Sequence, residues 1–112
     1  MLVNFTVKNY RSFKLERTFS MEASSIKEHK GSVISEGKYS LLPLAVFYGA
    51  NSGGKSNFIQ AISTMRSMVR RSVRLNEGDA LPYDPFALDE NSDSQPTLFE
   101  IQFIKGEVLY RY

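Results

Sequence analysis

The residues best suited to chemistry form one short glycine-rich stretch, Gly49–Ser56, with the sequence Gly-Ala-Asn-Ser-Gly-Gly-Lys-Ser. It matches the pattern G-x-x-x-x-G-K-[ST], in which the backbone N–H groups of a loop surround a polyphosphate. Glycine lets the backbone turn and approach the anion closely. Lys55 would place its charge on the outer phosphates, and the Ser56 hydroxyl would ligate Mg²⁺. The stretch predicts an ATP or GTP site; the plainer alternative is a glycine-rich turn before a helix.

The flanking sequence favours the phosphate loop. Residues 44–48, Leu-Ala-Val-Phe-Tyr, form an apolar run that predicts a buried strand. A helical period begins at Lys55 and continues to Arg74, with the positive N-terminus of the helix facing the anion. Its apolar face carries Phe58, Ile62, Met65, Val69 and Val73. Strand, glycine loop and helix therefore follow one another in the order that the motif needs.

The same helix carries a row of arginines. Arg66, Arg70 and Arg74 lie four residues apart, and Arg71 lies beside them. One interpretation is a contact to DNA or a partner, because so many arginines exceed what solubility requires. The other is a solvated face, since cations suit the C-terminal end of a helix. We take the solvated face as the default and keep DNA as a possible partner of this row.

Bulk composition limits the class of protein. The chain has 112 residues, of which 42% are hydrophobic, so it can form one domain or part of one. It has no cysteine, which excludes disulfides and cysteine metal sites. It has no apolar run of transmembrane length and no signal-peptide core. We therefore expect a cytoplasmic protein without a membrane partner, and no site role for His29, the single histidine.

Charge is distributed unevenly along the chain. Residues 1–75 carry a net charge of +8 and residues 76–112 a net charge of −6, which together give +2. The basic part could face a nucleotide or a nucleic acid. The simpler interpretation, which we favour, is that the two parts face each other or are solvated.

Short strands are predicted on both sides of the glycine loop. Alternation of Val3, Phe5 and Val7 indicates a half-buried first strand. The expected strands cover 2–8, 15–22 with Phe19 and Met21 inward, a short stretch near 33–34, 97–104 and 108–112, with a turn at 105–106. Residues 75–96 predict a long acidic loop. Leu81, Tyr83, Phe86 and Leu88 are expected to attach it to the rest of the chain.

A second motif that hydrolysis would need is not visible. Hydrolysis calls for an acidic residue at the end of a second buried strand, where it holds Mg²⁺ and positions water. The nearest match is Phe86–Glu90, but Pro85 shortens its apolar run and suits a loop. We expect Asp89 and Glu90 to belong to the acidic loop.

The N-terminal residues carry a further pattern. Leu2–Phe13, a strand followed by an Asn-Tyr-Arg-Ser-Phe turn, resembles the opening of SMC/RecF-like ABC-type ATPases. Gly49–Asn57, with asparagine after the serine, resembles the phosphate loop of that group. Tyr83–Phe86 and Pro96–Ile101 are similar to stretches in bacterial AAA-type ATP-binding proteins related to the OLD-family and phage-defence ATPases. The resemblance covers nearly the whole chain.

This resemblance implies an α/β fold, the N-terminal lobe of a P-loop NTPase, over residues 1–112. An antiparallel β subdomain would flank a parallel core built on a central strand, the P-loop and a helix. The resemblance also implies ATP rather than GTP, Mg²⁺, a homodimer of ATPase heads, and a role in DNA transactions or anti-phage defence. The residues implied to bind ATP are Gly49, Ala50, Asn51, Ser52, Gly53, Gly54, Lys55, Ser56, Asn57, Arg11 and Ser12.

The chain also departs from that group. Its members continue for hundreds of residues and carry a signature motif, a Walker B strand and a switch histidine, which do not occur here. We interpret the chain as an N-terminal piece, assign no catalytic residue, and expect slow or no ATP hydrolysis by the chain alone. The alternatives are a non-catalytic module that binds nucleotide or a partner, and another P-loop enzyme such as a kinase. The late position of the loop disfavours a kinase.

Overall fold

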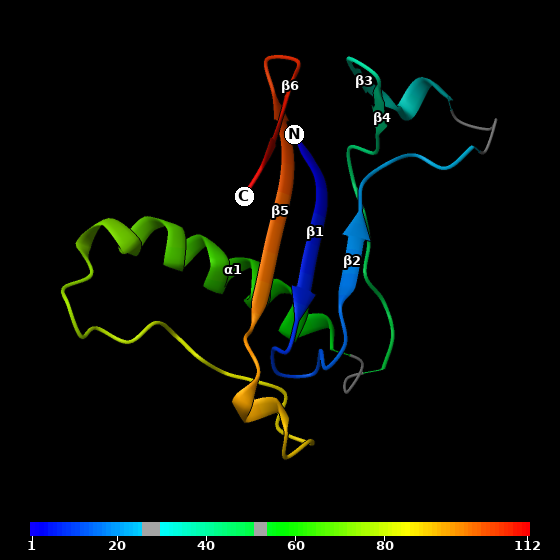
Figure 1. The fold of residues 1–112 in the computed structure, drawn as a ribbon. Helices are drawn as coiled ribbons and strands as arrows, with labels where there is room; N and C mark the ends of the chain where they lie inside the picture. The colour runs from blue at the N-terminus through cyan, green and yellow to red at the C-terminus, as the bar shows by residue number, and fades with distance from the viewer. Residues whose placement is uncertain (26–29, 51–53) are drawn as a thin grey trace. The chain divides into compact units, whose positions relative to one another are not determined.

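The computed structural model describes residues 1–25, 30–50 and 54–112 (Figure 1). The predictions that concern His29, Asn51, Ser52 and Gly53 lie outside these residues. The described chain divides into two compact units, each of which is considered by itself. The first comprises Met1–Thr6, Thr18–Phe47 and Glu100–Tyr112, and the second comprises Val7–Arg17 and Tyr48–Phe99.

Among the described residues, the main sheet has four strands in the order β2-β1-β5-β6 (Figure 1). Their bounds are Leu2–Lys8 for β1, Arg17–Ser20 for β2, Leu98–Lys105 for β5 and Val108–Arg111 for β6. The Ile104 N–H donates to the Met1 carbonyl at 2.7 Å, which places the start of β1 beside the end of β5. β1 and β5 are therefore antiparallel, as are β5 and β6.

The sequence pattern of β1 is confirmed, because Val3, Phe5 and Val7 are fully buried. β2 is shorter than the predicted strand, and Leu15 is exposed. The hairpin turn between β5 and β6 falls at residues 106–107, one residue later than predicted. Across this hairpin the rings of Phe103 and Tyr110 stack, with centroids 5.3 Å apart.

A second, two-stranded sheet belongs to the first unit. After a 3₁₀ turn, η1 (Lys30–Ser32), strand β3 (Ile34–Glu36) pairs antiparallel with β4 (Tyr39–Leu41). Only the first of these strands was predicted, since three residues are too few to show a period. Leu41 is nevertheless fully buried, in a cluster with Val3 and Ile104. The hairpin therefore contributes to the core of this unit.

The prediction of a buried strand over residues 44–48 is wrong. These residues form no strand, and Leu44, Val46 and Tyr48 are 72%, 73% and 91% exposed. A buried parallel strand needs neighbouring strands on both sides, and no strand in the described ranges pairs with this segment. Phe47 makes a ring contact with Phe19, with centroids 5.0 Å apart. The described fold is thus mixed α/β with antiparallel sheets, without the expected parallel core.

The predicted helix forms. α1 spans Lys55–Arg71 and continues as a 3₁₀ turn, η2 (Ser72–Arg74). Phe58, Ala61 and Met65 are buried, but Val69 and Val73 are 40% and 91% exposed. The periodicity correctly identified an apolar face, but burial also needs an element that covers it. Among the described residues, no helix is long and apolar enough to span a membrane.

Candidate nucleotide-binding site

The N-terminus of α1 has no side-chain cap among the described residues. Gly54 is its N-cap in the left-handed conformation, with φ 81° and ψ 3°, and no side chain caps the helix. The first turn contains no acidic residue that would neutralise the positive end of the helix. The Phe58 N–H makes an early backbone bond of the helix, to the Gly54 carbonyl at 2.9 Å. The backbone N–H groups before it can therefore donate to a bound anion. Ser56, in the same turn, is exposed.

Lys55 lies back against the chain that precedes the helix. Its Nζ donates to the carbonyls of Gly49 and Ala50, each at 2.6 Å. These bonds are partly solvent-exposed, and an ammonium group has three donors. Phosphate oxygens are stronger acceptors than peptide carbonyls because they are charged. The arrangement therefore holds a cation at the start of α1 through contacts that an anion can replace.

The N-terminal turn reaches the same place. Ser12 Oγ accepts a hydrogen bond from Asn57 Nδ2 at 3.0 Å. A Cβ atom added at Gly54 would lie 3.0 Å from that Ser12 oxygen, closer than side chains normally pack. Glycine is therefore needed at position 54 for two reasons, the left-handed backbone and the close approach of Ser12. Of the residues implied by resemblance, Ser12 and Asn57 lie together at the N-terminus of α1.

Arg11 has a different neighbourhood. Its backbone N–H donates to the Asp84 carbonyl at 2.9 Å, and its Nε lies 2.5 Å from the Asp84 carboxylate. The guanidinium also lies 5.5 Å from the centre of the Tyr10 ring. The structure thus joins Arg11 to the acidic loop. It gives no contact between the guanidinium and the described residues of the glycine stretch.

Asn9 is a buried residue whose contacts with the acidic loop were not predicted from the sequence. It is 2% exposed, and its Nδ2 donates to the carbonyls of Ser92 and Gln95 at 2.8 Å each. Its Oδ1 accepts from the Phe86 N–H at 3.1 Å. Asn9 has a positive φ of 49°, which asparagine tolerates better than most residues. An asparagine directly after a strand was the signal, but its partners lie far away in sequence.

Asn9 attaches the acidic loop more firmly than the predicted apolar residues do. Leu88 is 87% exposed and Leu81 is 53% exposed, so the prediction that they attach the loop is wrong. The contacts of the Tyr83 hydroxyl do not attach the loop to the rest of the chain, because they lie within the loop itself. That hydroxyl lies 2.9 Å from the carbonyls of both Asp93 and Gln95. Polar contacts therefore hold the loop where apolar ones were expected.

Asp89 lies in this loop rather than at the end of a strand, as expected. Its carboxylate lies 3.3 Å from Lys14 Nζ and accepts a hydrogen bond from the Ser92 hydroxyl at 3.1 Å. In the described part of the chain, no three His, Asp or Glu side chains gather in a way that could hold a metal ion.

A comparison with protein families gives the class. Residues 44–112, more than half of the chain, match the family described as "AAA domain, putative AbiEii toxin, Type IV TA system". The protein therefore contains a domain of the AAA, P-loop ATPase type. More narrowly, the chain belongs to this AbiEii toxin-like AAA family. The match is consistent with nucleotide binding and starts at Leu44, so Arg11 and Ser12 lie outside it. Neither the curated proteins nor the solved structures gave a significant match.

Proposed function

We propose that this chain binds ATP through Gly49–Ser56, used as a Walker A phosphate loop. The observation that carries the proposal is the uncapped N-terminus of α1, with the Lys55 ammonium bonded to the carbonyls of Gly49 and Ala50 beside it. Membership of an AAA family supports the same conclusion. The residues proposed to bind ATP are Gly49, Ala50, Asn51, Ser52, Gly53, Gly54, Lys55, Ser56, Asn57, Arg11 and Ser12.

The described residues fit a polyphosphate. Backbone N–H groups of the first turn would donate to phosphate oxygens, and Lys55 would exchange its two carbonyl partners for them. Ser56, exposed in that turn, would ligate Mg²⁺, which neutralises phosphate charge when bound. Ser12, bonded to Asn57, would stabilise the start of the helix. Arg11 would use the guanidinium N–H groups that its ion pair with Asp84, made through Nε, leaves over.

The wider proposal follows from the resemblance. Residues 1–112 would be the N-terminal lobe of an SMC/RecF-like ABC-type ATPase domain. In a full-length protein such heads would form a homodimer in the cytoplasm and act in DNA transactions or anti-phage defence. The second candidate is a regulatory module that binds nucleotide without turnover. It is favoured by the contacts of Asp89, whose carboxylate is engaged by Lys14 and Ser92.

Calorimetric titration with Mg-ATP tests the binding proposal. A charge-assisted bond contributes about 1.5–3 kcal/mol, so Lys55→Ala should weaken ATP binding by roughly 10- to 100-fold. Lys38→Ala removes an exposed lysine near Tyr39 instead and should leave affinity unchanged. Absence of binding heat in the wild type, or equal affinity of Lys55→Ala and wild type, would refute the site.

A phosphate-release assay measures whether the chain turns over ATP by itself. Both candidates predict turnover by the 112-residue chain far below about 1 s⁻¹, the low end of ordinary enzymes. Turnover near that value, abolished in Lys55→Ala, would instead show a self-sufficient ATPase. The calorimetric result stands in either case, because binding and hydrolysis are measured separately.

A further inference from the structure

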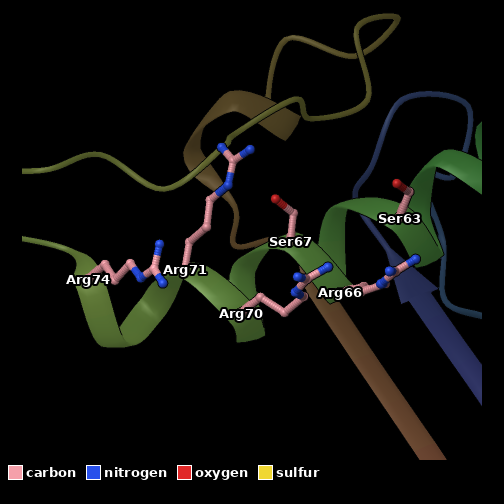
Figure 2. Close-up of a pocket in the computed structure, with 6 residues that line it drawn as sticks. All are labelled: Ser63, Arg66, Ser67, Arg70, Arg71 and Arg74. Atoms are coloured by element: carbon pink, nitrogen blue, oxygen red, sulfur yellow. The ribbon is translucent and has the colours of Figure 1, made fainter.

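The C-terminal half of α1 and η2 carry a charged hollow that nucleotide binding does not use. The hollow has a volume of about 490 Å³. It is lined by Ser63, Arg66, Ser67, Arg70, Arg71 and Arg74 (Figure 2). We call Arg66, Arg70, Arg71 and Arg74 the arginine face. Figure 2 shows Arg66 and Arg70 extending in one direction along the helix, with Arg71 projecting away from it.

Helix geometry sets this face apart from the buried one. At about 100° per residue, the six lining residues fall within an arc of about 140°. Ala61 and Met65, both buried, lie on the opposite side of the helix. The rise of about 1.5 Å per residue separates Arg66, Arg70 and Arg74 by about 6 Å each, or about 12 Å in all. The face is therefore a regular row of cations.

The charge of this face is not neutralised within the described residues. The ion pairs found there use Arg11, Lys14 and Arg111. None of the arginine face takes part in them. The nearby acidic loop has engaged two of its carboxylates elsewhere, Asp84 with Arg11 and Asp89 with Lys14. Four guanidinium groups thus remain available to an external polyanion.

The lining chemistry distinguishes between partners. Hot spots of protein interfaces combine aromatic residues with arginine in closely packed, desolvated pockets, whereas this lining has arginine and serine but no aromatic residue. Guanidinium forks match phosphate oxygens, and serine hydroxyls commonly contact them too. A strand of duplex DNA rises about 3.4 Å per phosphate, so a row about 12 Å long spans three to four phosphates.

We propose that the arginine face binds the phosphodiester backbone of a nucleic-acid duplex without reading its bases. This deepens the proposed role in DNA transactions and rests on it for biological context only. The contact itself needs no nucleotide, because its residues lie beyond the first turns of α1. It also needs no contribution from Lys55 or Ser12.

Fluorescence anisotropy with a labelled duplex of about 20 base pairs tests the proposal at about 50 to 200 mM salt. Four phosphate contacts predict a slope of log affinity against log salt of about −3 to −4, and one contact predicts about −1. The triple variant Arg66→Ala, Arg70→Ala, Arg74→Ala should therefore show the shallow slope and bind about tenfold or more weakly at low salt. Circular dichroism checks that its helix is intact.

A charge-matched control makes the test specific. The variant Arg17→Ala, Lys38→Ala, Lys105→Ala removes three exposed cations outside the face and should keep the wild-type slope. The lysine variant Arg66→Lys, Arg70→Lys, Arg74→Lys should keep the slope with weaker binding, because lysine retains charge but lacks the guanidinium fork.

Several outcomes overturn the proposal. They are no duplex binding by the wild type, an unchanged slope in the triple alanine variant, and equal binding of polyglutamate of matched charge. Parallel DNA and RNA duplexes show which backbone is preferred, and tight binding of either supports the proposal. The two proposals can be refuted separately. Lys55→Ala should bind duplex normally, and the triple alanine variant should bind Mg-ATP normally.

Discussion

Replacing Gly54 by alanine tests whether the start of α1 has the geometry that the proposed site requires. The new side chain meets two obstacles. The left-handed backbone, with φ 81°, disfavours any residue that carries a Cβ. That Cβ would also lie 3.0 Å from Ser12 Oγ, which accepts the hydrogen bond from Asn57.

The expected cost can be worked out from these two terms. The backbone term is about 1–2 kcal/mol. Ser12 is exposed and can rotate away, at the cost of its bond to Asn57, which contributes about 0.5–1.5 kcal/mol. Gly54→Ala should therefore lower the free energy of unfolding by about 1.5–3.5 kcal/mol. The double variant Ser12→Ala, Gly54→Ala should show a favourable coupling of about 1 kcal/mol.

Urea denaturation of the four proteins in this cycle measures the coupling, and calorimetry measures ATP affinity beside it. Gly37→Ala is the control, because Gly37 has a positive φ of 60° and open space around its missing Cβ. It should show the backbone term without the contact term. Equal stability of Gly54→Ala and wild type, or zero coupling with Ser12, would refute the reasoning. Loss of ATP binding in Gly54→Ala beyond its loss of stability would support the phosphate loop.

Three further predictions follow from side-chain contacts. Asn9→Ala should lower the free energy of unfolding by about 2–4 kcal/mol, because three polar loop groups, one buried and two part-buried, lose their partner; Asn9→Gly removes the backbone part of that cost. In Glu100→Gln, urea denaturation should depend less on pH below 4.5, because hydrogen bonds, first from Arg111, lower the pKa of Glu100 from its ordinary value of 4.5. That stabilisation is complete above pH 4.5 and is lost as pH falls through the lowered pKa. Asp84→Ala should raise ATP affinity a few-fold by calorimetry if Arg11 then reaches the nucleotide, and unchanged affinity would argue against that role.

Local patterns predicted the elements whose burial is decided by near neighbours. Alternation in 2–8 predicted β1, and the period from Lys55 predicted α1 to within a few residues. These predictions succeeded because turn chemistry and periodicity act over a few residues.

The failures concern residues whose state depends on distant partners. Apolar composition predicted a buried strand over residues 44–48. A strand needs a neighbouring backbone to pair with, and none of the described strands supplies one. Leu88 was expected to attach the acidic loop. The buried Asn9 side chain attaches it instead, through a hydrogen bond to Ser92, which lies 83 residues later in the sequence. Sequence spacing holds no information about such a pair, whereas the resemblance did single out the turn that contains Asn9.

That turn explains how one short segment can serve two places in the second unit. Tyr10 and Phe13 close it with reciprocal backbone bonds of 3.0 and 2.8 Å, which fix the residues between them. On one side Ser12 approaches the start of α1, and on the other Arg11 binds the acidic loop. A displacement of Ser12 from Asn57 would therefore act on the same turn that holds Arg11. If nucleotide binding moves the start of α1, the acidic loop is the element to which that movement is transmitted first.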